Sequence, residues 1–193
     1  MLIRHVYGKQ IQSYIDDIAS LRLKVFKDFP YLYGENIEDE HKYLERYSLS
    51  KNSLVILVLD NDKVVGASTA LPLSDADSGF KEPFENSVYN IDDIFYFGES
   101  VLLREYRGKG IGNQFFQERE KFALSLGYNS FVFCAVNREK NHPLRPINFS
   151  DLDDWWSRIG YQPMPSLVCN YSWKEVGSLQ EVMNSLTFWQ KGL

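Results

Sequence analysis

Glycine occupies every second position from 108 to 112, in the segment Glu105-Tyr106-Arg107-Gly108-Lys109-Gly110-Ile111-Gly112. The residues before this segment are typical of a strand, and the apolar positions after it recur at helical spacing up to Leu126. Glycine allows positive φ and close approach of a ligand, and the first N–H groups of a helix have no partner inside it. The segment therefore predicts a strand, a glycine turn and a helix whose start is open to a ligand.

Phosphate is the ligand that such a helix start favours. The helix dipole places partial positive charge there, and Arg107 and Lys109 add formal charge. Two common nucleotide loops do not fit. The four-residue spacing before Gly-Lys-Ser/Thr of a P-loop is missing, and Asn113 stands where a dinucleotide fingerprint needs Gly or Ala. The alternative interpretation is a plain glycine turn with two solvated cations.

The rest of the chain alternates between strand and helix patterns. Strands are predicted at residues 2–7, 53–59, 63–71, 94–103, 130–136, 167–173 and 183–190, and helices at 11–25, 39–47, 111–126 and 151–158. Residues 72–93 are rich in Pro, Ser, Asp and Asn, so we expect an ordered connection with one helical turn. The helix after the glycine turn is expected to join its two flanking strands in parallel.

Length and composition limit the class of protein. The 193 residues suit one domain, and 44% hydrophobic with 24% charged residues is typical of globular proteins. No apolar run is long enough to span a membrane, and Met1 to Val6 lack the features of a secretory signal, so we expect a cytoplasmic protein. The net charge of −5 disfavours nucleic acid as a partner. Cys134 and Cys169 form no metal-binding pattern, so no metal is expected.

The glycine segment resembles the pyrophosphate loop of the GNAT superfamily, whose pattern is Arg/Gln-x-x-Gly-x-Gly/Ala after the fourth strand. Arg107, Gly110 and Gly112 match this pattern. Residues 97–103 resemble the family's splayed fourth strand, residues 131–137 its fifth strand, and residues 155–161 its helix ending in Gly-Phe or Gly-Tyr. The resemblance implies a single α/β layered domain over residues 1–193. Its sheet would be mixed and mostly antiparallel, with about seven strands and a splayed parallel pair.

The function implied by this resemblance is N-acyl transfer. An acetyl group would pass from acetyl-CoA to a primary amine of a small molecule or peptide, by direct transfer in a ternary complex. Backbone amides of the loop would hold the pyrophosphate and main-chain groups of the fourth strand would hold the pantetheine arm. The implied cofactor-binding residues are Val101, Leu102, Arg107, Gly108, Lys109, Gly110, Ile111, Gly112 and Asn137. Asn137 is equally well explained as the turn residue that ends a strand.

Catalysis needs a group that takes the proton of the amine, directly or through water. Glu99 is the predicted general base, because it lies on the strand that borders the thioester; the alternative is an exposed glutamate on a strand face. In the family, a tyrosine in the later helix often protonates the thiolate, and here Trp156 stands at that position. The indole N–H can donate a hydrogen bond but is not acidic enough to protonate a thiolate. Water or Tyr161 would have to serve instead.

A second departure from the family is an insertion at residues 138–150. It contains Arg138, His142 and Arg145, and it lies where an acceptor would enter. We therefore predict that the insertion shapes the acceptor site, with Arg138, His142 or Arg145 able to bind a substrate carboxylate. The alternative is a solvated basic loop.

Two other functions are compatible with the sequence. One is a non-catalytic acyl-CoA-binding module, which the absence of a tyrosine at 156 favours. The other is an interaction protein that uses the aromatic residues between Phe80 and Phe97 as a contact surface. The sequence leaves open whether the acceptor is an amino acid, a peptide N-terminus, a polyamine or an antibiotic, and whether the protein is a monomer or a homodimer.

Overall fold

Seven strands form one mixed sheet in the order β1-β2-β3-β4-β5-β7-β6. The computed structural model describes residues 1–193 throughout. The strands are β1 (Leu2–Tyr7), β2 (Leu54–Asp60), β3 (Lys63–Pro72), β4 (Ile94–Leu102), β5 (Ser130–Val136), β6 (Gln162–Lys174) and β7 (Glu181–Lys191). Only β4 and β5 are parallel, and every other neighbouring pair is antiparallel. The predicted mixed, mostly antiparallel sheet with one parallel pair is confirmed.

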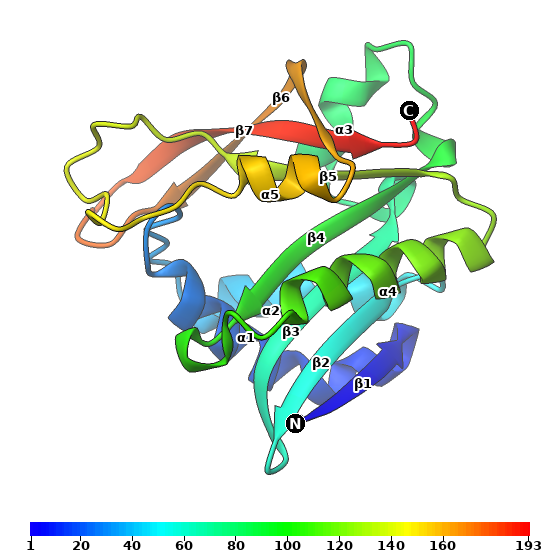
Figure 1. Ribbon diagram of the computed structural model, residues 1–193, viewed down its shortest axis with the longest axis horizontal. Helices are drawn as coiled ribbons and strands as arrows, with labels where there is room; N and C mark the ends of the chain where they lie inside the picture. Colours follow the sequence, from blue (N-terminus) through cyan, green and yellow to red (C-terminus); the bar gives the residue numbers. More distant parts are fainter.

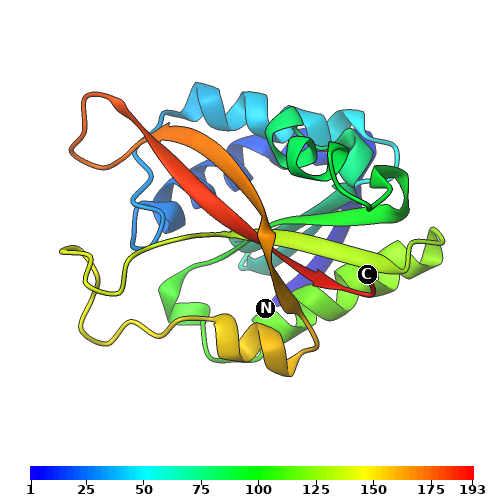
Figure 2. The ribbon, with the colours of Figure 1, turned by 90° about the horizontal axis from the view of Figure 1, so that it is seen from above.

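Helices cover both faces of the sheet (Figure 2). The helices α1 (Ile15–Phe26), α2 (Ile37–Leu49) and α3 (Ser78–Glu85) lie on one face, and α4 (Ile111–Ser125) and α5 (Asp153–Arg158) lie on the other. Short 3-10 turns occur at Gly8–Tyr14 (η1), Leu73–Asp75 (η2), Ile91–Asp93 (η3) and Arg104–Tyr106 (η4). None of the helices combines the length and the apolar character that crossing a membrane requires.

The two-sided covering explains the central strands. All six residues from Leu54 to Leu59 are buried, with alternate side chains entering the core on either face. A continuous apolar run is what a strand covered on both sides requires, although such runs are more typical of parallel sheets. The core is therefore divided by the sheet into an α1–α3 side and an α4–α5 side.

Two segments differ from the pattern read in the sequence, and the burial of the aromatic residues bears on one alternative function. The helix expected at residues 11–25 begins only at Ile15, because Gly8–Tyr14 form the 3-10 turn η1. The connection at residues 72–93 contains a two-turn helix, α3, whose Phe80 and Phe84 are buried. Phe95 and Phe97 are also fully buried, so these aromatic side chains belong to the core and form no contact surface.

The parallel pair opens like a V. β4 and β5 are in register only from Ile94↔Ser130 to Tyr96↔Val132. Beyond that point β4 keeps only β3 as a neighbouring strand, and β5 keeps only β7. Figure 1 shows the two strands close together at one end and diverging toward the insertion loop and the tip of the β6–β7 hairpin. One edge of β4 is thereby left without a neighbouring strand over its second half.

Candidate functional site

The glycine turn between β4 and α4 is open and unpaired. Gly108 has φ of +74° and Gly110 has φ of +81°, and a Cβ at either position would meet no atom within 4 Å. The backbone N–H groups of Gly108, Lys109 and Gly110 donate no hydrogen bond within the protein. The first amides of α4 add to them, because a helix start has no internal acceptors for its N–H groups. The turn is thus a cradle of free donors with room for an anion.

Gly112 has a different role from the other two glycines. A Cβ there would lie 3.2 Å from the Trp155 ring, so the missing side chain makes room for Trp155 of α5. The Trp155 indole N–H also donates to Asn113 Oδ1 at 2.7 Å. Gly112 therefore lets α5 pack against the start of α4, and its direct contact with a cofactor stays a prediction.

The cations of the turn lie on its surface. The Arg107 side chain donates from Nε to the carbonyl oxygen of Leu102 at 3.0 Å, which ties the turn to the open edge of β4. Lys109 Nζ lies 5.2 Å from the centre of the Tyr106 ring, and the Tyr106 hydroxyl donates to Asp60 at 2.7 Å. Both cations are exposed, so both are available to a phosphate.

The alternation of the β3–β4 ladder shows which main-chain groups face the V. Leu103 N–H donates to Val65, so Leu103 points toward β3, and Val101, two residues earlier, also faces β3 opposite Ala67. Ser100 and Leu102 then face the open edge. Leu102 was predicted to bind the cofactor arm and is placed for this. Ser100, which was not predicted, faces the open edge where Val101 was expected to bind the arm. Because neighbouring residues of a strand face opposite sides, this assignment follows once the pairing of β3 and β4 is known.

A β-bulge aims Glu99. The register runs from Ser68↔Ser100 to Ala70↔Phe97, so Thr69 alone lies opposite both Gly98 and Glu99. An extra residue in one strand interrupts the alternation of side chains. The bulge turns Glu99 to the α1–α2 side of the sheet, where it contacts Arg22 and Tyr43. Gly98 is required there, because a Cβ would collide with the Tyr47 hydroxyl and Thr69 Oγ1.

Glu99 belongs to a buried charge cluster and is not an exposed glutamate. Its Oε2 lies 2.7 Å from Arg22 Nη1 and accepts a hydrogen bond from the Tyr43 hydroxyl at 3.1 Å. Arg22 Nε is also bonded to Glu40, whose side chain is fully buried. The Oε1 atoms of Glu99 and Glu40 have no hydrogen-bond partner. One guanidinium thus serves two carboxylates, and each carboxylate keeps one unbonded oxygen.

Burial and charge fix the ionisation of this cluster. Burial works against the charge of Arg22, but Glu99 and Glu40 outweigh it and raise the pKa of Arg22 above its usual value. Burial, reinforced by Glu99, raises the pKa of Tyr43, so this hydroxyl keeps its proton. Arg22 was not predicted from the sequence. It could have been found as a charged residue one turn after Ile18, on the apolar face of a predicted helix.

The aromatic residues of the α5 region lie on the other side of the sheet. Trp156 packs against Phe133 and Trp189, with ring centres 4.9 and 5.1 Å apart. Tyr161 is buried and donates to Glu120 at 3.0 Å, and burial, with the Glu120 carboxylate, raises its pKa. Tyr161 is therefore engaged with Glu120, and its raised pKa makes it a poor proton donor.

Asn137 and the insertion are committed to structural contacts. The Asn137 amide donates to Ser185 Oγ at 3.1 Å and accepts from Thr187 Oγ1 at 3.0 Å, so both ends of its side chain bind β7. Arg138 donates to the carbonyls of Pro30 and Tyr31 and pairs with Glu175 at 2.7 Å. These contacts agree with the alternative interpretation, in which Asn137 is the residue that ends a strand.

Arg145 and His142 are also held within the insertion. Arg145 makes two hydrogen bonds to Asp151, at 3.1 and 2.8 Å, and lies over the Phe149 ring. Its hydrogen bonds lower the pKa of Asp151. The His142 ring packs near Phe29, and His142 Nδ1 accepts from Leu144 N–H. A substrate carboxylate would have to compete with the protein's own partners for both arginines.

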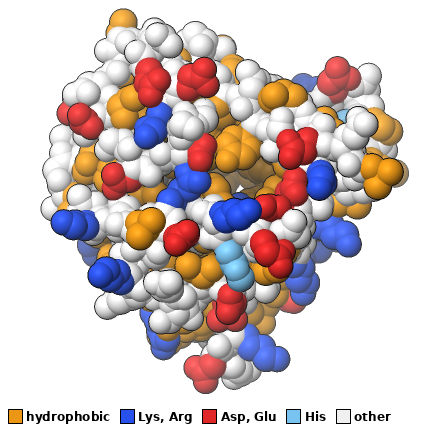
Figure 3. Space-filling model, turned by 180° about the vertical axis from the view of Figure 1, so that it is seen from behind, with side chains coloured by type: hydrophobic (Ala, Val, Ile, Leu, Met, Phe, Trp, Pro, Cys, Tyr) orange, Lys and Arg blue, Asp and Glu red, His pale blue; other side chains and the backbone are white.

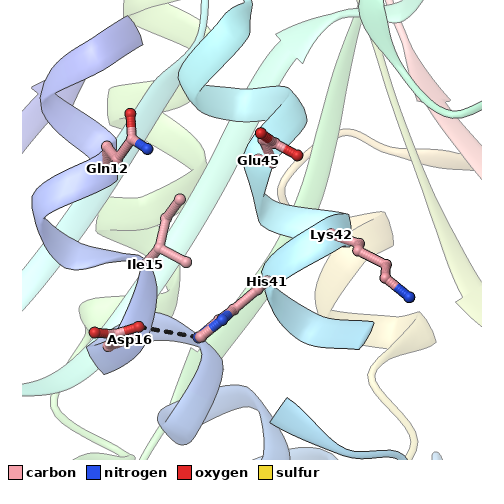
Figure 4. Close-up of a pocket in the computed structure, with 6 residues that line it drawn as sticks. All are labelled: Gln12, Ile15, Asp16, His41, Lys42 and Glu45. Carbon is pink, nitrogen blue, oxygen red and sulfur yellow. Dashed lines mark ion pairs between the residues drawn. The ribbon is translucent and has the colours of Figure 1, made fainter. Parts of the chain in front are cut away.

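Two hollows elsewhere on the surface contain none of the predicted residues. One of about 340 Å³ lies between η1, α1 and α2; there His41 lies 3.0 Å from Asp16, as Figure 4 shows. Another of about 460 Å³ lies near Asp92, Asp93 and the end of α4. Figure 3, seen from behind Figure 1, shows a central hollow with hydrophobic, acidic and basic side chains around it. No group of His, Cys, Asp and Glu side chains is arranged to hold a metal ion.

Comparisons with known proteins agree with this geometry. The sequence model of the Acetyltransferase (GNAT) family matches residues 18–146. Among solved structures, the ribosomal-protein-alanine N-acetyltransferase of Brucella melitensis is similar with a TM-score of 0.61, 14% identity and full coverage of both chains. No curated protein sequence matches the chain.

Two similar structures contain the coenzyme. The PaiA N-acetyltransferase of Thermoplasma acidophilum, in complex with coenzyme A, has a TM-score of 0.57 and 12% identity, with full coverage of both chains. YncA of Salmonella typhimurium, solved with acetyl-CoA, has a TM-score of 0.59 and 11% identity over all of this chain and 95% of its own. At these identities the likeness is one of fold.

Proposed function

Because the chain belongs to the acetyltransferase (GNAT) family, we propose that it transfers an acetyl group from acetyl-CoA to a primary amine of a small molecule or peptide. The observation that carries this proposal is the open glycine turn at the start of α4, beside the unpaired edge of β4. Free amides, a helix dipole and two exposed cations suit a diphosphate. The open edge of β4 beside them suits the pantetheine arm of acetyl-CoA, whose amide groups can form hydrogen bonds with the strand as a neighbouring strand would.

The residues of this chain would divide the work as follows. The turn amides and the side chains of Arg107 and Lys109 would hold the diphosphate. The N–H of Ser100 and the main-chain groups of Leu102 would bind the arm, with the Ser100 N–H directed at the thioester carbonyl. Acetyl-CoA supplies the activated acyl group, and an N–H donor aimed at the developing oxyanion lowers the barrier to its transfer.

Glu99 is the proposed proton acceptor for the amine. It is fixed by Arg22 and Tyr43 through Oε2, and its Oε1 makes no hydrogen bond. Because Oε1 is buried, the proton would reach it through a water molecule or after a small movement of the amine's binding site. The carboxylate itself is held in one orientation by Arg22 and Tyr43, which favours proton transfer to it.

The departing thiolate has no tyrosine near it on the α5 side, since Trp156 and Tyr161 are packed elsewhere. A thiol has a reference pKa of about 8.5, so the thiolate is a tolerable leaving group and water suffices to protonate it. Arg138, His142 and Arg145 are proposed to shape the acceptor entrance, with Arg138 joining the insertion to the α1–α2 connection.

The proposal is tested by mixing purified protein with acetyl-CoA and a panel of primary amines while measuring free thiol. Amine-dependent thiol release is expected, with a product whose mass is increased by one acetyl group. Tight binding of acetyl-CoA without thiol release for any amine would support the alternative of a non-catalytic binding module, which the position of Trp156 favours. Absence of binding would contradict the proposal altogether.

A further inference from the structure

A buried arginine lies behind β4 without a carboxylate partner. Arg119 of α4 is 1% exposed and sits between the rings of Phe97 and Phe116, 4.5 and 4.6 Å from their centres. Its Nε donates to Phe115 in its own helix at 3.2 Å, its Nη1 donates to the carbonyl of Thr69 at 3.4 Å, and its Nη2 has no partner. A charge in an apolar cluster is costly unless it is paired, so packing alone does not explain this residue.

The contact with Thr69 is made at the bulge of the site. Thr69 is the β3 residue that lies opposite both Gly98 and Glu99, and it has no register partner on β4. Arg119 reaches its carbonyl from the α4 side of the sheet, while the Tyr47 hydroxyl crowds Gly98 from the α2 side. The bulge is thus held from both faces.

The charge of Arg119 persists at neutral pH and acts on the same site. Burial lowers the pKa of Arg119 to about 10, and the carboxylate of Glu99 is among the groups that oppose this decrease. Glu99 therefore lies within the electrostatic reach of Arg119, although the two residues approach β4 from opposite faces. Charges act over longer distances in a dry core than in water.

The bulge sets two geometries at once. It turns Glu99 toward Arg22 and Tyr43, and it precedes Ser100, whose N–H faces the open edge. Donors to a developing oxyanion need placement within about 0.5 Å of their productive position. A cation fixed behind the bulge would hold that placement and strengthen the donor, because the positive potential favours negative charge on the carbonyl oxygen.

We propose that Arg119 is a positioning residue that fixes the Gly98–Glu99 bulge and adds positive potential behind the Ser100 N–H, so that the thioester carbonyl is polarised. This inference rests on the proposed acetyl transfer, and Arg119 would contribute to that reaction without touching either substrate. It also links α4, the helix that would hold the diphosphate, to the strand that would hold the reacting carbonyl.

The experiment compares Arg119→Met, Arg119→Lys and Phe116→Leu with the wild type. Carbonyl stretching is measured by infrared difference spectroscopy on bound acetyl-CoA labelled with carbon-13 at the carbonyl. Wild type should shift the stretch to lower frequency than in free acetyl-CoA. Arg119→Met should lose most of this shift and lower kcat roughly tenfold, while its affinity for CoA stays within about twofold. Arg119→Lys, which keeps the charge, should retain most of the shift.

Thermal unfolding and hydrogen exchange separate positioning from simple stability. Methionine fills the same apolar space without a buried charge, so the Arg119→Met variant should melt no lower than wild type. The amides of Gly98 and Glu99 in the bulge should nevertheless exchange faster in the free protein. Phe116→Leu, the packing control, should melt several degrees lower and keep the carbonyl shift.

The outcomes are distinguishable. If wild type does not bind acetyl-CoA, the proposed function fails and this inference falls with it. If wild type binds and shifts the carbonyl but Arg119→Met shifts it equally, only the inference is overturned. A lysine variant that matches the methionine variant would also overturn it, because charge would then have no part in the effect.

Discussion

Three glycines that look equivalent in the sequence have two different purposes at the residue scale. Gly108 and Gly110 have positive φ and open space around them, whereas Gly112 has its space filled by Trp155. The first two provide the conformation that exposes N–H groups, and the third permits helix packing. A substitution at Gly110 should therefore weaken the binding of an anion, whereas a substitution at Gly112 should disturb the packing of α5 against α4.

Gly110→Asp should weaken CoA binding at least tenfold, because it places negative charge and a strained φ at the diphosphate site. Isothermal titration with CoA measures this. The matched control is Gly177→Asp, since Gly177 also has a positive φ of +84° and no atom within 4 Å of its Cβ position. Both variants should lose about 1–2 kcal/mol of stability, but only Gly110→Asp should lose CoA affinity. Equal affinities would remove the turn from the cofactor site.

Glu99→Gln should leave CoA binding intact and lower kcat about a hundredfold at neutral pH, since the amide cannot accept the amine's proton. The deficit should shrink at high pH, where the amine is already neutral. Steady-state kinetics over a pH series measures this. The fold should survive, because Glu40 still compensates the charge of Arg22.

The control for Glu99 is Glu40→Gln. Both carboxylates share Arg22, but Glu40 lies on α2 and is fully buried. Glu40→Gln should therefore have a much smaller effect on kcat than Glu99→Gln. If both variants were slowed equally, the effect would come from the charge cluster as a whole, and Glu99 would lose its role as the base.

At the scale of elements, the insertion after β5 is joined to the α1–α2 connection by Arg138. Its guanidinium bonds the carbonyls of Pro30 and Tyr31 and the carboxylate of Glu175 near the end of β6. Three segments far apart in the sequence are thus fixed together beside the mouth of the V (Figure 1). An arginine suits this place because its planar fork serves several acceptors at once.

Arg138→Met should loosen this junction. We expect a loss of about 1–3 kcal/mol of stability, because Glu175 and two carbonyls lose a donor. Amide exchange at residues 27–36 should become faster, and the KM of the acceptor should rise more than that of acetyl-CoA.

The matched control for Arg138 is Arg145→Met, which breaks the pair with Asp151 inside the same insertion and leaves the α1–α2 connection untouched. Hydrogen exchange followed by mass spectrometry distinguishes the two variants. Unchanged exchange at residues 27–36 in Arg138→Met would show that Arg138 does not hold this junction.

At the scale of the whole molecule, the two halves of the sheet meet through few main-chain contacts. Only three register pairs join β4 to β5, whereas β6 and β7 share ten. A cofactor lying in the V would contact both halves and the start of α4. Binding should therefore stabilise the whole fold and not only the loop that holds the phosphates.

CoA at about one hundred times its Kd should stabilise the folded protein by about 2.7 kcal/mol. For a chain of this size that corresponds to a rise in Tm of about 5–10 °C. Differential scanning fluorimetry with CoA, and with adenosine as the control without a diphosphate, measures it. No shift with CoA would contradict a cofactor site in the V.

The sequence by itself determined the elements and the place of the open glycine turn that is proposed to hold the diphosphate. All seven strands, the parallel pair and the glycine turn were predictable, because period, turn residues and helix starts are local properties. The insertion at residues 138–150 was also visible, because Asn137 and Trp156 are farther apart than the resemblance to the family implies.

Only the tertiary structure decided how the site is built. A bulge is a mismatch between two strands, so neither β3 nor β4 alone shows that Glu99 turns toward Arg22 or that Ser100, and not Val101, faces the open edge. Likewise, no local pattern tells that Arg138 is bonded to the α1–α2 connection, or that Trp155 fills the space of Gly112. These contacts join residues distant in the chain, and their geometry exists only when the elements are packed together.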